Sequence, residues 1–144
     1  MLLGEKIGAA LLMMFLCTLI HALFMAAGTH ALDWRLTRFG PAKGPFDRVL
    51  LVWLMILWMF IAIMIEAWAW GLLYLYNPMI TALPDAQSAF YFSMVTYTTL
   101  GYGDIVLTGA WRTLAAVQAG NGVIIFGWTT ALIFYFIQKI YKNN

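Results

Sequence analysis

Apolar residues are concentrated in three long stretches, and most of the charged residues lie between or beyond them. The stretches cover residues 7–28, 49–76 and 111–138. A helix needs around 20 residues to cross a hydrocarbon core of about 30 Å, so each stretch is predicted to be a transmembrane helix. Composition agrees, because 10% of the residues are charged, against about 25% in an ordinary soluble domain. The chain is therefore predicted to be an all-α integral membrane protein.

A fourth apolar segment, residues 86–98, is too short to cross the membrane, because a helix of this length measures only about 20 Å. Pro84 and Asp85 predict where it starts, since proline ends the preceding turn and aspartate caps free backbone N–H groups. We interpret the segment as a re-entrant helix. Its C-terminal end would carry a partial negative charge and would favour a cation placed beyond it.

The residues from Thr98 to Asp104 follow this short helix and read Thr-Thr-Leu-Gly-Tyr-Gly-Asp. Irregular backbone at membrane depth is tolerated only where protein surrounds it or where it lines a water-filled path. Gly101 and Gly103 reach positive φ readily, so they are predicted to let successive carbonyl groups face one axis. Rings of such carbonyls from four identical loops replace the hydration shell of potassium. The alternative is a turn between two helices, which glycine and aspartate also suit.

The segment from Tyr91 to Asp104 resembles the pore helix and selectivity filter of the potassium channel superfamily, in particular of small prokaryotic channels with one pore loop per subunit. The resemblance covers about residues 50–138. It implies a homotetramer that conducts K⁺ passively and selectively, with the ion held by backbone carbonyls and one threonine hydroxyl. The implied ion ligands are Thr99, Leu100, Gly101 and Tyr102, and the implied supports are Thr98, Gly103 and Asp104.

Two residues depart from the pattern of that family. Leu100 stands where valine is usual, which is a mild change because the backbone carbonyl is the ligand. Val95 stands where some bacterial members place a glutamate that pairs with the filter aspartate. Asp104 is therefore expected to lack that partner.

The third long stretch also fits the resemblance. Gly122 falls where such channels often have a hinge glycine, and on that alignment three residues spaced i, i+3 and i+7 would line a cavity from one helical face. Close helix packing is the alternative explanation for Gly122 and Gly127, because small residues at this spacing are common at helix contacts in membranes. The cavity-lining candidates are Val123, Phe126 and Thr130.

Glu66 lies inside the second long stretch, where a carboxylate is costly and by default suggests a function. Counting the helical rise from the outer ends places it at a depth close to that of Asn121, and Gln118 shares a helical face with Asn121. We hypothesise that these residues and hydroxyl groups of the short helix form a polar network that braces the filter from behind. The alternative is a protonated Glu66 satisfied by one backbone carbonyl.

The distribution of lysine and arginine sets the predicted orientation. Residues 77–110 contain neither, whereas both cluster in the first connection and in the tail. We therefore predict a cell-membrane protein with its N-terminus and filter outside and its C-terminus in the cytoplasm. A cleavable signal peptide is the alternative for residues 1–28. The basic residues that decide the orientation are Arg35, Arg38, Lys43, Arg48, Lys139 and Lys142.

His21 and His30 raise a different class of function, a haem- or quinone-linked membrane oxidoreductase. They lie nine residues apart on one segment. We expect His21 to pack near the inner leaflet and His30 to cap the end of its helix. The single cysteine, Cys17, is expected to be a packing residue.

These considerations predict a non-enzyme with an extra N-terminal helix and basic connection at residues 1–48 and a pore domain at 49–144. The pore domain would contain the pore helix 86–98 and the filter 99–104. The expected partners are three identical subunits and membrane lipid, with no nucleic acid. Permeant K⁺ is the expected ion, with no organic cofactor and no catalytic residue. A non-selective or non-conducting accessory subunit remains an alternative.

Overall fold

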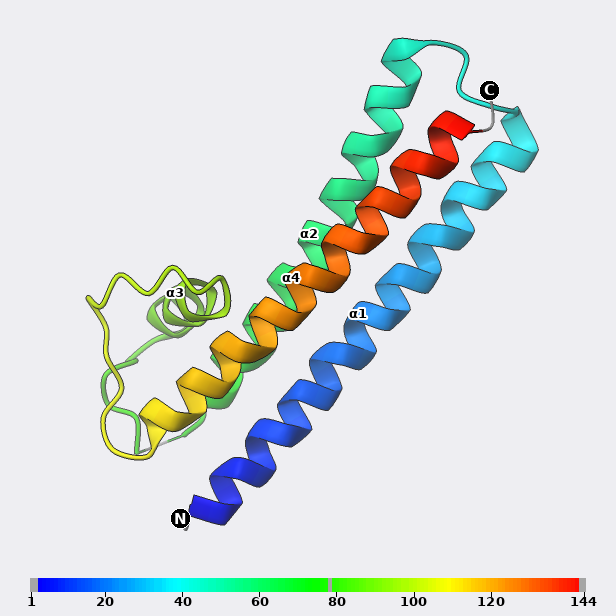
Figure 1. The fold of residues 1–144 in the computed structure, drawn as a ribbon. Coiled ribbons are helices and arrows are strands. Elements are labelled where there is room, and N and C mark those ends of the chain that lie inside the picture. The colour runs from blue at the N-terminus through cyan, green and yellow to red at the C-terminus, as the bar shows by residue number, and fades with distance from the viewer. Residues whose placement is uncertain (1–2, 78, 143–144) are drawn as a thin grey trace.

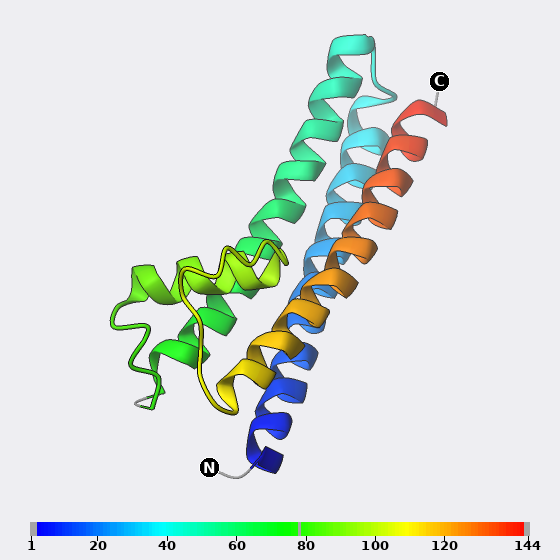
Figure 2. The ribbon, with the colours of Figure 1, turned by 60° about the vertical axis from the view of Figure 1, so that its left-hand side comes forward.

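The computed structural model describes residues 3–77 and 79–142, and all regular secondary structure in this part of the chain is helical. Three long helices lie alongside one another, and the short helix projects from the side of this bundle (Figures 1 and 2). The long helices are each long and apolar enough to cross a membrane, as predicted. The elements are α1 (Leu3–Phe39), α2 (Pro45–Leu75), α3 (Ala86–Tyr97) and α4 (Trp111–Lys142).

Helix α1 is longer than predicted, and this changes the place of His30. The helix continues past residue 28 to Phe39, so His30 is an exposed residue inside the helix and does not cap its end. No residue between 29 and 39 breaks the helix. It ends before Gly40, whose φ of +79° is the left-handed conformation that often terminates helices. Only residues 40–44 then separate α1 from α2, so the predicted basic connection is mostly helix.

Helix α1 is attached to α2 and α4 along much of its length. The indole Nε1 of Trp58 donates a hydrogen bond of 2.8 Å to the carbonyl oxygen of Phe24. Nearer its C-terminal end, Arg35 forms an ion pair of 2.5 Å with Asp47 of α2, and Asp33 forms one with Lys139 of α4. These contacts make α1 an integral part of the bundle.

Helix α3 begins as the sequence predicts. Asp85 is its N-cap, and the carboxylate accepts a hydrogen bond of 2.7 Å from the backbone N–H of Ser88. This bond holds the pKa of Asp85 below its usual range. The C-terminal end of α3 lies against the bundle, and the following loop runs back along the helix before it descends to α4 (Figure 2).

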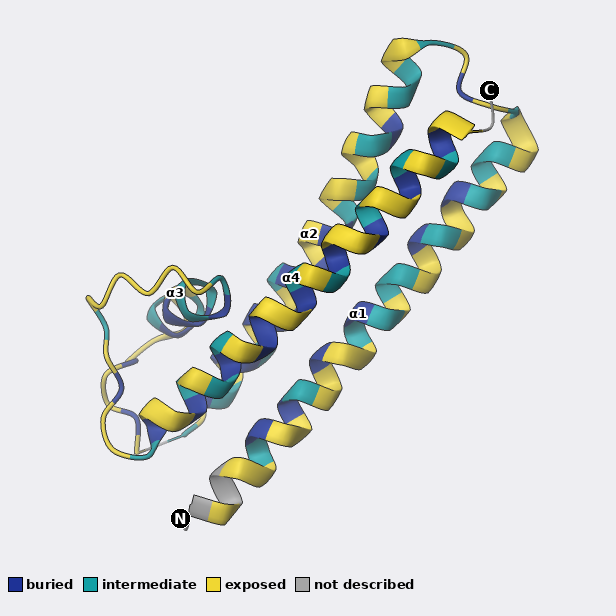
Figure 3. Ribbon diagram, viewed as in Figure 1, coloured by how far each residue is buried: buried dark blue, intermediate teal, exposed yellow. Residues whose placement is uncertain are grey.

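The outward faces of the long helices are apolar. Figure 3 shows exposed positions recurring along α1, α2 and α4, and many of them hold large hydrophobic side chains. Contiguous exposed apolar surface of this extent is rare on monomeric soluble proteins. It agrees with helices that contact lipid or other subunits. Examples are Leu11, Phe15 and Leu23 of α1, Trp53 and Phe60 of α2, and Ile124 and Phe134 of α4.

The closest backbone approach between α4 and α3 occurs at Gly122. A Cβ atom added there would lie 1.9 Å from the carbonyl oxygen of Tyr97, the last residue of α3. At Gly127 no described atom lies within 4 Å of an added Cβ. A direct contact with α3 therefore explains a glycine at position 122 by close helix packing. Within the described chain, no such contact explains Gly127.

We expect Gly122→Ala to lower the free energy of unfolding by about 1–3 kcal/mol, because the backbone of Tyr97 must move to admit a methyl group. Thermal unfolding in detergent measures the effect. Gly127→Ala is the matched control, and its unfolding temperature should equal or exceed that of the unmodified protein, since alanine favours a helix over glycine. Equal unfolding temperatures for the two variants would contradict the tight contact between α4 and α3.

Candidate ion-conducting loop and its supports

The loop that follows α3 has an alternating backbone conformation. Thr99, Gly101 and Gly103 have φ values of 60°, 55° and 78°, whereas Leu100 and Tyr102 between them have negative φ. The positive φ predicted for the two glycines is confirmed.

Thr99 is the residue of this loop whose conformation could not be predicted from its type. Positive φ is unusual for a β-branched residue and costs on the order of 1–3 kcal/mol. Two backbone hydrogen bonds hold the turn: Thr99 N–H donates to Thr96 at 3.0 Å, and Gly101 N–H donates to Val95 at 3.2 Å. The last turn of α3 therefore fixes the start of the loop.

Asp104, at the far end of the loop, has a partner on α3. The hydroxyl of Tyr91 donates a hydrogen bond of 2.7 Å to its carboxylate, and this bond holds the pKa of Asp104 below its usual range. Val95 stands where the family pattern can place a partner for Asp104, and its side chain offers no hydrogen-bond donor. The structure places Tyr91 in the supporting position, so both ends of the loop are tied to α3.

The loop lies on the side of α2 and α4 away from α1 (Figures 1 and 2). Residues 99–104 are exposed apart from contacts with α3, and Leu100 and Tyr102 have 56% and 67% of their surfaces accessible. Thr98 is held by its hydroxyl, which donates to Met94 at 2.8 Å. In a single chain, the surface of the loop is therefore accessible to solvent or to another subunit.

The three cavity candidates on α4 differ in their contacts. Val123 is 59% exposed, and Thr130 is exposed with its hydroxyl bonded to the carbonyl of Phe126 at 2.8 Å. Phe126 is half-buried beside the ring of Tyr97, with 6.4 Å between the ring centroids. All three follow Gly122 on α4, the residue at which α4 contacts the end of α3.

Gln118 connects α4 to the middle of α3. Its Nε2 donates to the hydroxyl and the carbonyl oxygen of Ser93 at 2.7 and 3.2 Å, and its Oε1 accepts from the hydroxyl of Tyr74 at 2.8 Å. Ser93 in turn donates to the carbonyl oxygen of Ala67 on α2. All four residues are buried, and they join three helices behind the loop.

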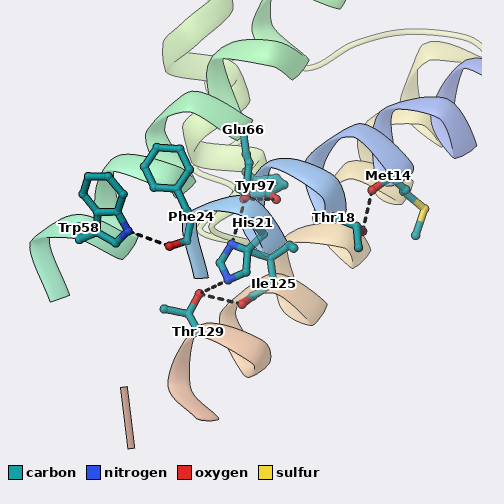
Figure 4. A network of polar contacts seen from close by, with 9 residues as sticks. All are labelled: Met14, Thr18, His21, Phe24, Trp58, Glu66, Tyr97, Ile125 and Thr129. Atoms are coloured by element: carbon teal, nitrogen blue, oxygen red, sulfur yellow. Dashed lines mark hydrogen bonds and ion pairs between the residues drawn. The ribbon is translucent and has the colours of Figure 1, made fainter. Parts of the chain in front are cut away.

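Glu66 belongs to a second cluster that reaches α1. Its Oε1 lies 3.1 Å from Nδ1 of His21, and its Oε2 accepts a hydrogen bond of 2.9 Å from the hydroxyl of Tyr97 (Figure 4). Both His21 and Glu66 are fully buried. Two side chains therefore contact the carboxylate, in place of the single backbone carbonyl considered as an alternative.

The hypothesised network is thus divided into two clusters. No hydrogen bond in the described part of the chain joins Glu66 to Gln118 or Asn121. Asn121 is buried, and its Nδ2 has no hydrogen-bond partner among the described residues. It lies beside the buried thiol of Cys17, which also neighbours Glu66 and Tyr97.

His21 is the member of this site that the sequence did not identify. A buried carboxylate requires a partner, so the sequence indicated that Glu66 has one. It did not indicate which residue, because the register of α1 against α2 cannot be derived from the sequence. His30 lies on the same helix and is exposed. No group of three or more His, Cys, Asp or Glu residues with metal-binding geometry occurs in the described segments.

Comparison with known families agrees with this geometry. A family described as "Ion channel" matches residues 48–139, more than half of the chain. The search of curated proteins and the search of solved structures gave no match. The matched region includes nearly all of α2, the whole of α3 with its loop, and most of α4, and it leaves α1 outside. The chain therefore belongs to the pore-loop ion channel family and is a membrane protein.

Proposed function

We propose that the protein is a potassium-selective channel that conducts K⁺ passively as a homotetramer. The observation that carries the proposal is the alternation of positive φ at Thr99, Gly101 and Gly103, directly after the end of α3. In this proposal, the alternating φ values turn the carbonyl groups of residues 99–102 to one side of the loop. Four such loops around one axis would replace the hydration shell of the ion.

In this proposal the backbone carbonyls of Thr99, Leu100, Gly101 and Tyr102 bind K⁺ together with the hydroxyl of Thr99. Their side chains and backbone are exposed on the isolated chain, as expected for a surface that faces three identical subunits. The C-terminal end of α3 points to the start of the loop, and its partial negative charge favours a cation there. K⁺ is thus the permeant ion, and no organic cofactor is required.

The remaining residues act as supports in this proposal. Thr98 and Asp104 hold the loop against α3, Asp104 through Tyr91, and Gly103 supplies the positive φ next to Asp104. Val123, Phe126 and Thr130 would line a cavity on the inner side of the loop. The helix α3 would be re-entrant, with the loop and N-terminus outside the cell membrane, the C-terminus in the cytoplasm and lipid around the outer helices.

Reconstitution in liposomes tests the function. K⁺-selective flux is expected, with Na⁺ excluded. Gly101→Ala should abolish selective flux in intact tetramers, because alanine in left-handed backbone costs about 1–2 kcal/mol in each of four subunits. No described atom lies within 4 Å of the added Cβ, so the effect would report backbone conformation and not a clash.

Gly109→Ala is the matched control for this experiment. Gly109 has a φ of +58° and equally open space around it, but it lies outside the loop. It should therefore pay a similar conformational cost and retain selectivity. Equal K⁺ and Na⁺ flux in the unmodified protein would indicate a non-selective relative, and absence of flux from intact tetramers would favour an accessory subunit.

Tyr91→Phe tests the support at the far end of the loop. Loss of the donor should raise the pKa of Asp104 towards its ordinary value. A carboxyl group with a lowered pKa in the folded state contributes stability above its unfolded pKa and loses it as the pH falls through its folded pKa. Acid-induced loss of K⁺ flux should therefore begin at a higher pH in Tyr91→Phe.

The measurement is K⁺ flux from liposomes as the bath at the loop-facing side is acidified. Tyr76→Phe is the control, because Tyr76 is 80% exposed and lies outside both α3 and the loop. Coincident acid profiles for Tyr91→Phe and the unmodified protein would show that the Tyr91 contact does not stabilise the conducting loop.

A further inference from the structure

The buried cluster around His21 connects the first helix to the residue that precedes the loop. His21 lies on α1, Glu66 on α2, and Tyr97 is the last residue of α3. Figure 4 shows the three side chains converging, with Thr129 of α4 on the other side of the imidazole. Four helices are therefore joined through His21 and Glu66.

The contacts define which atoms donate. An ionised carboxylate only accepts hydrogen bonds, so with Glu66 ionised both Nδ1–H of His21 and the hydroxyl of Tyr97 donate to it. The other nitrogen, Nε2, lies 3.2 Å from the hydroxyl oxygen of Thr129, which has one proton to donate, either to Nε2 or to the carbonyl oxygen of Ile125 at 2.9 Å. His21 is thereby held on both edges, and it orients the carboxylate that holds Tyr97.

Tyr97 is in turn held from two directions. Its hydroxyl is bound to Glu66, and its backbone carbonyl lies against Gly122 of α4, where even a methyl group would not fit. Thr98 and the strained Thr99 follow at once in the chain. A displacement of the Tyr97 ring therefore acts directly on the backbone at the start of the loop.

The groups that face His21 come from every neighbouring helix. Glu66 lies on α2, Thr129 and the ring of Trp128 lie on α4, and the Trp128 ring centroid is 5.2 Å from that of the imidazole. Cys17 of α1 neighbours Glu66 and Tyr97. Within the described chain, the hydrogen bond from α1 to Glu66 is the one made by Nδ1 of His21.

We propose that His21 is a positioning residue for the loop 98–104: through Glu66 it fixes Tyr97, and α1 thereby becomes a structural part of the filter. The proposal deepens the proposed function and rests on it only for the identity of the ion. It assigns a role to a helix that lies outside the matched family region. Loosening the Nδ1–Glu66 contact should therefore loosen the loop.

Hydrogen exchange of the full-length protein in liposomes, read by mass spectrometry, tests the proposal without requiring conduction. The N–H groups of Thr99 and Gly101 are bonded to the last turn of α3, so their exchange reports on the loop. His21→Leu should speed exchange in residues 98–104 at least about threefold, in the range of coupling found within buried networks.

Three further variants separate positioning from general packing. His21→Asn retains an amide N–H at the position of Nδ1 and should keep the loop as protected as in the unmodified protein. Thr129→Val removes the contact at Nε2 and a bond within α4 but keeps the contact between Nδ1 and Glu66, so it should also leave the loop protected. Tyr97→Phe should open the loop, and combining it with His21→Leu should add little, because both changes break one chain of contacts.

His21→Leu leaves Glu66 with one described donor fewer, so the variant can fail to assemble. The comparison of His21→Asn with Thr129→Val then carries the test. Faster loop exchange in both of these variants would overturn the proposal, as would a His21→Leu variant that opens α1 while residues 98–104 stay protected.

Flux measurements on the same samples distinguish this proposal from the proposed function. If the unmodified protein shows no K⁺ selectivity while loop protection still depends on His21, the proposed function fails and the coupling stands. The opposite outcome is a K⁺-selective unmodified protein and an assembled His21→Leu variant in which both the Na⁺ permeability and the rate of loop exchange are unchanged. In that case the coupling fails and the proposed function stands.

Discussion

The attachment of Tyr97 is the constraint on which the rest of this structure depends. The helix α3 ends there, and the next residues leave helical geometry for an alternating backbone that includes threonine at positive φ. Such a conformation persists only where its surroundings determine it. Gly122 presses on the Tyr97 backbone, and Glu66 binds its hydroxyl, so both parts of the residue are fixed before the loop begins.

The supports behind the loop act at different levels of α3. Tyr91 holds the far end through Asp104, Ser93 and Gln118 tie the middle to α2 and α4, and Tyr97 is held at the near end. The short helix is thus fixed along its length by hydrogen bonds as well as by apolar packing. In a membrane such directional contacts matter, because lipid is as apolar as the helix surfaces and the hydrophobic effect favours no particular register.

Much of the architecture could be predicted from the sequence because its signals are local. Hydropathy identified the three long helices, Asp85 marked the start of α3, and the glycines indicated positive φ at residues 101 and 103. Contacts between helices were not predictable in the same way. Helical rise placed Glu66 at a depth near Asn121, but depth does not determine rotation, and the carboxylate faces His21 and Tyr97 instead. Tyr91 was visible as a residue but not as the partner of Asp104.

The cost of burying Glu66 explains why α1 and the site belong together. A carboxylate inside a bilayer requires donors, and the backbone N–H groups around Glu66 are already used in the hydrogen bonds of its own helix. Tyr97 supplies one donor and His21 the other. Removing one partner of such a buried pair is strongly destabilising because it leaves an uncompensated charge. The same energetic requirement that retains α1 against the bundle therefore also fixes the side chain next to the loop.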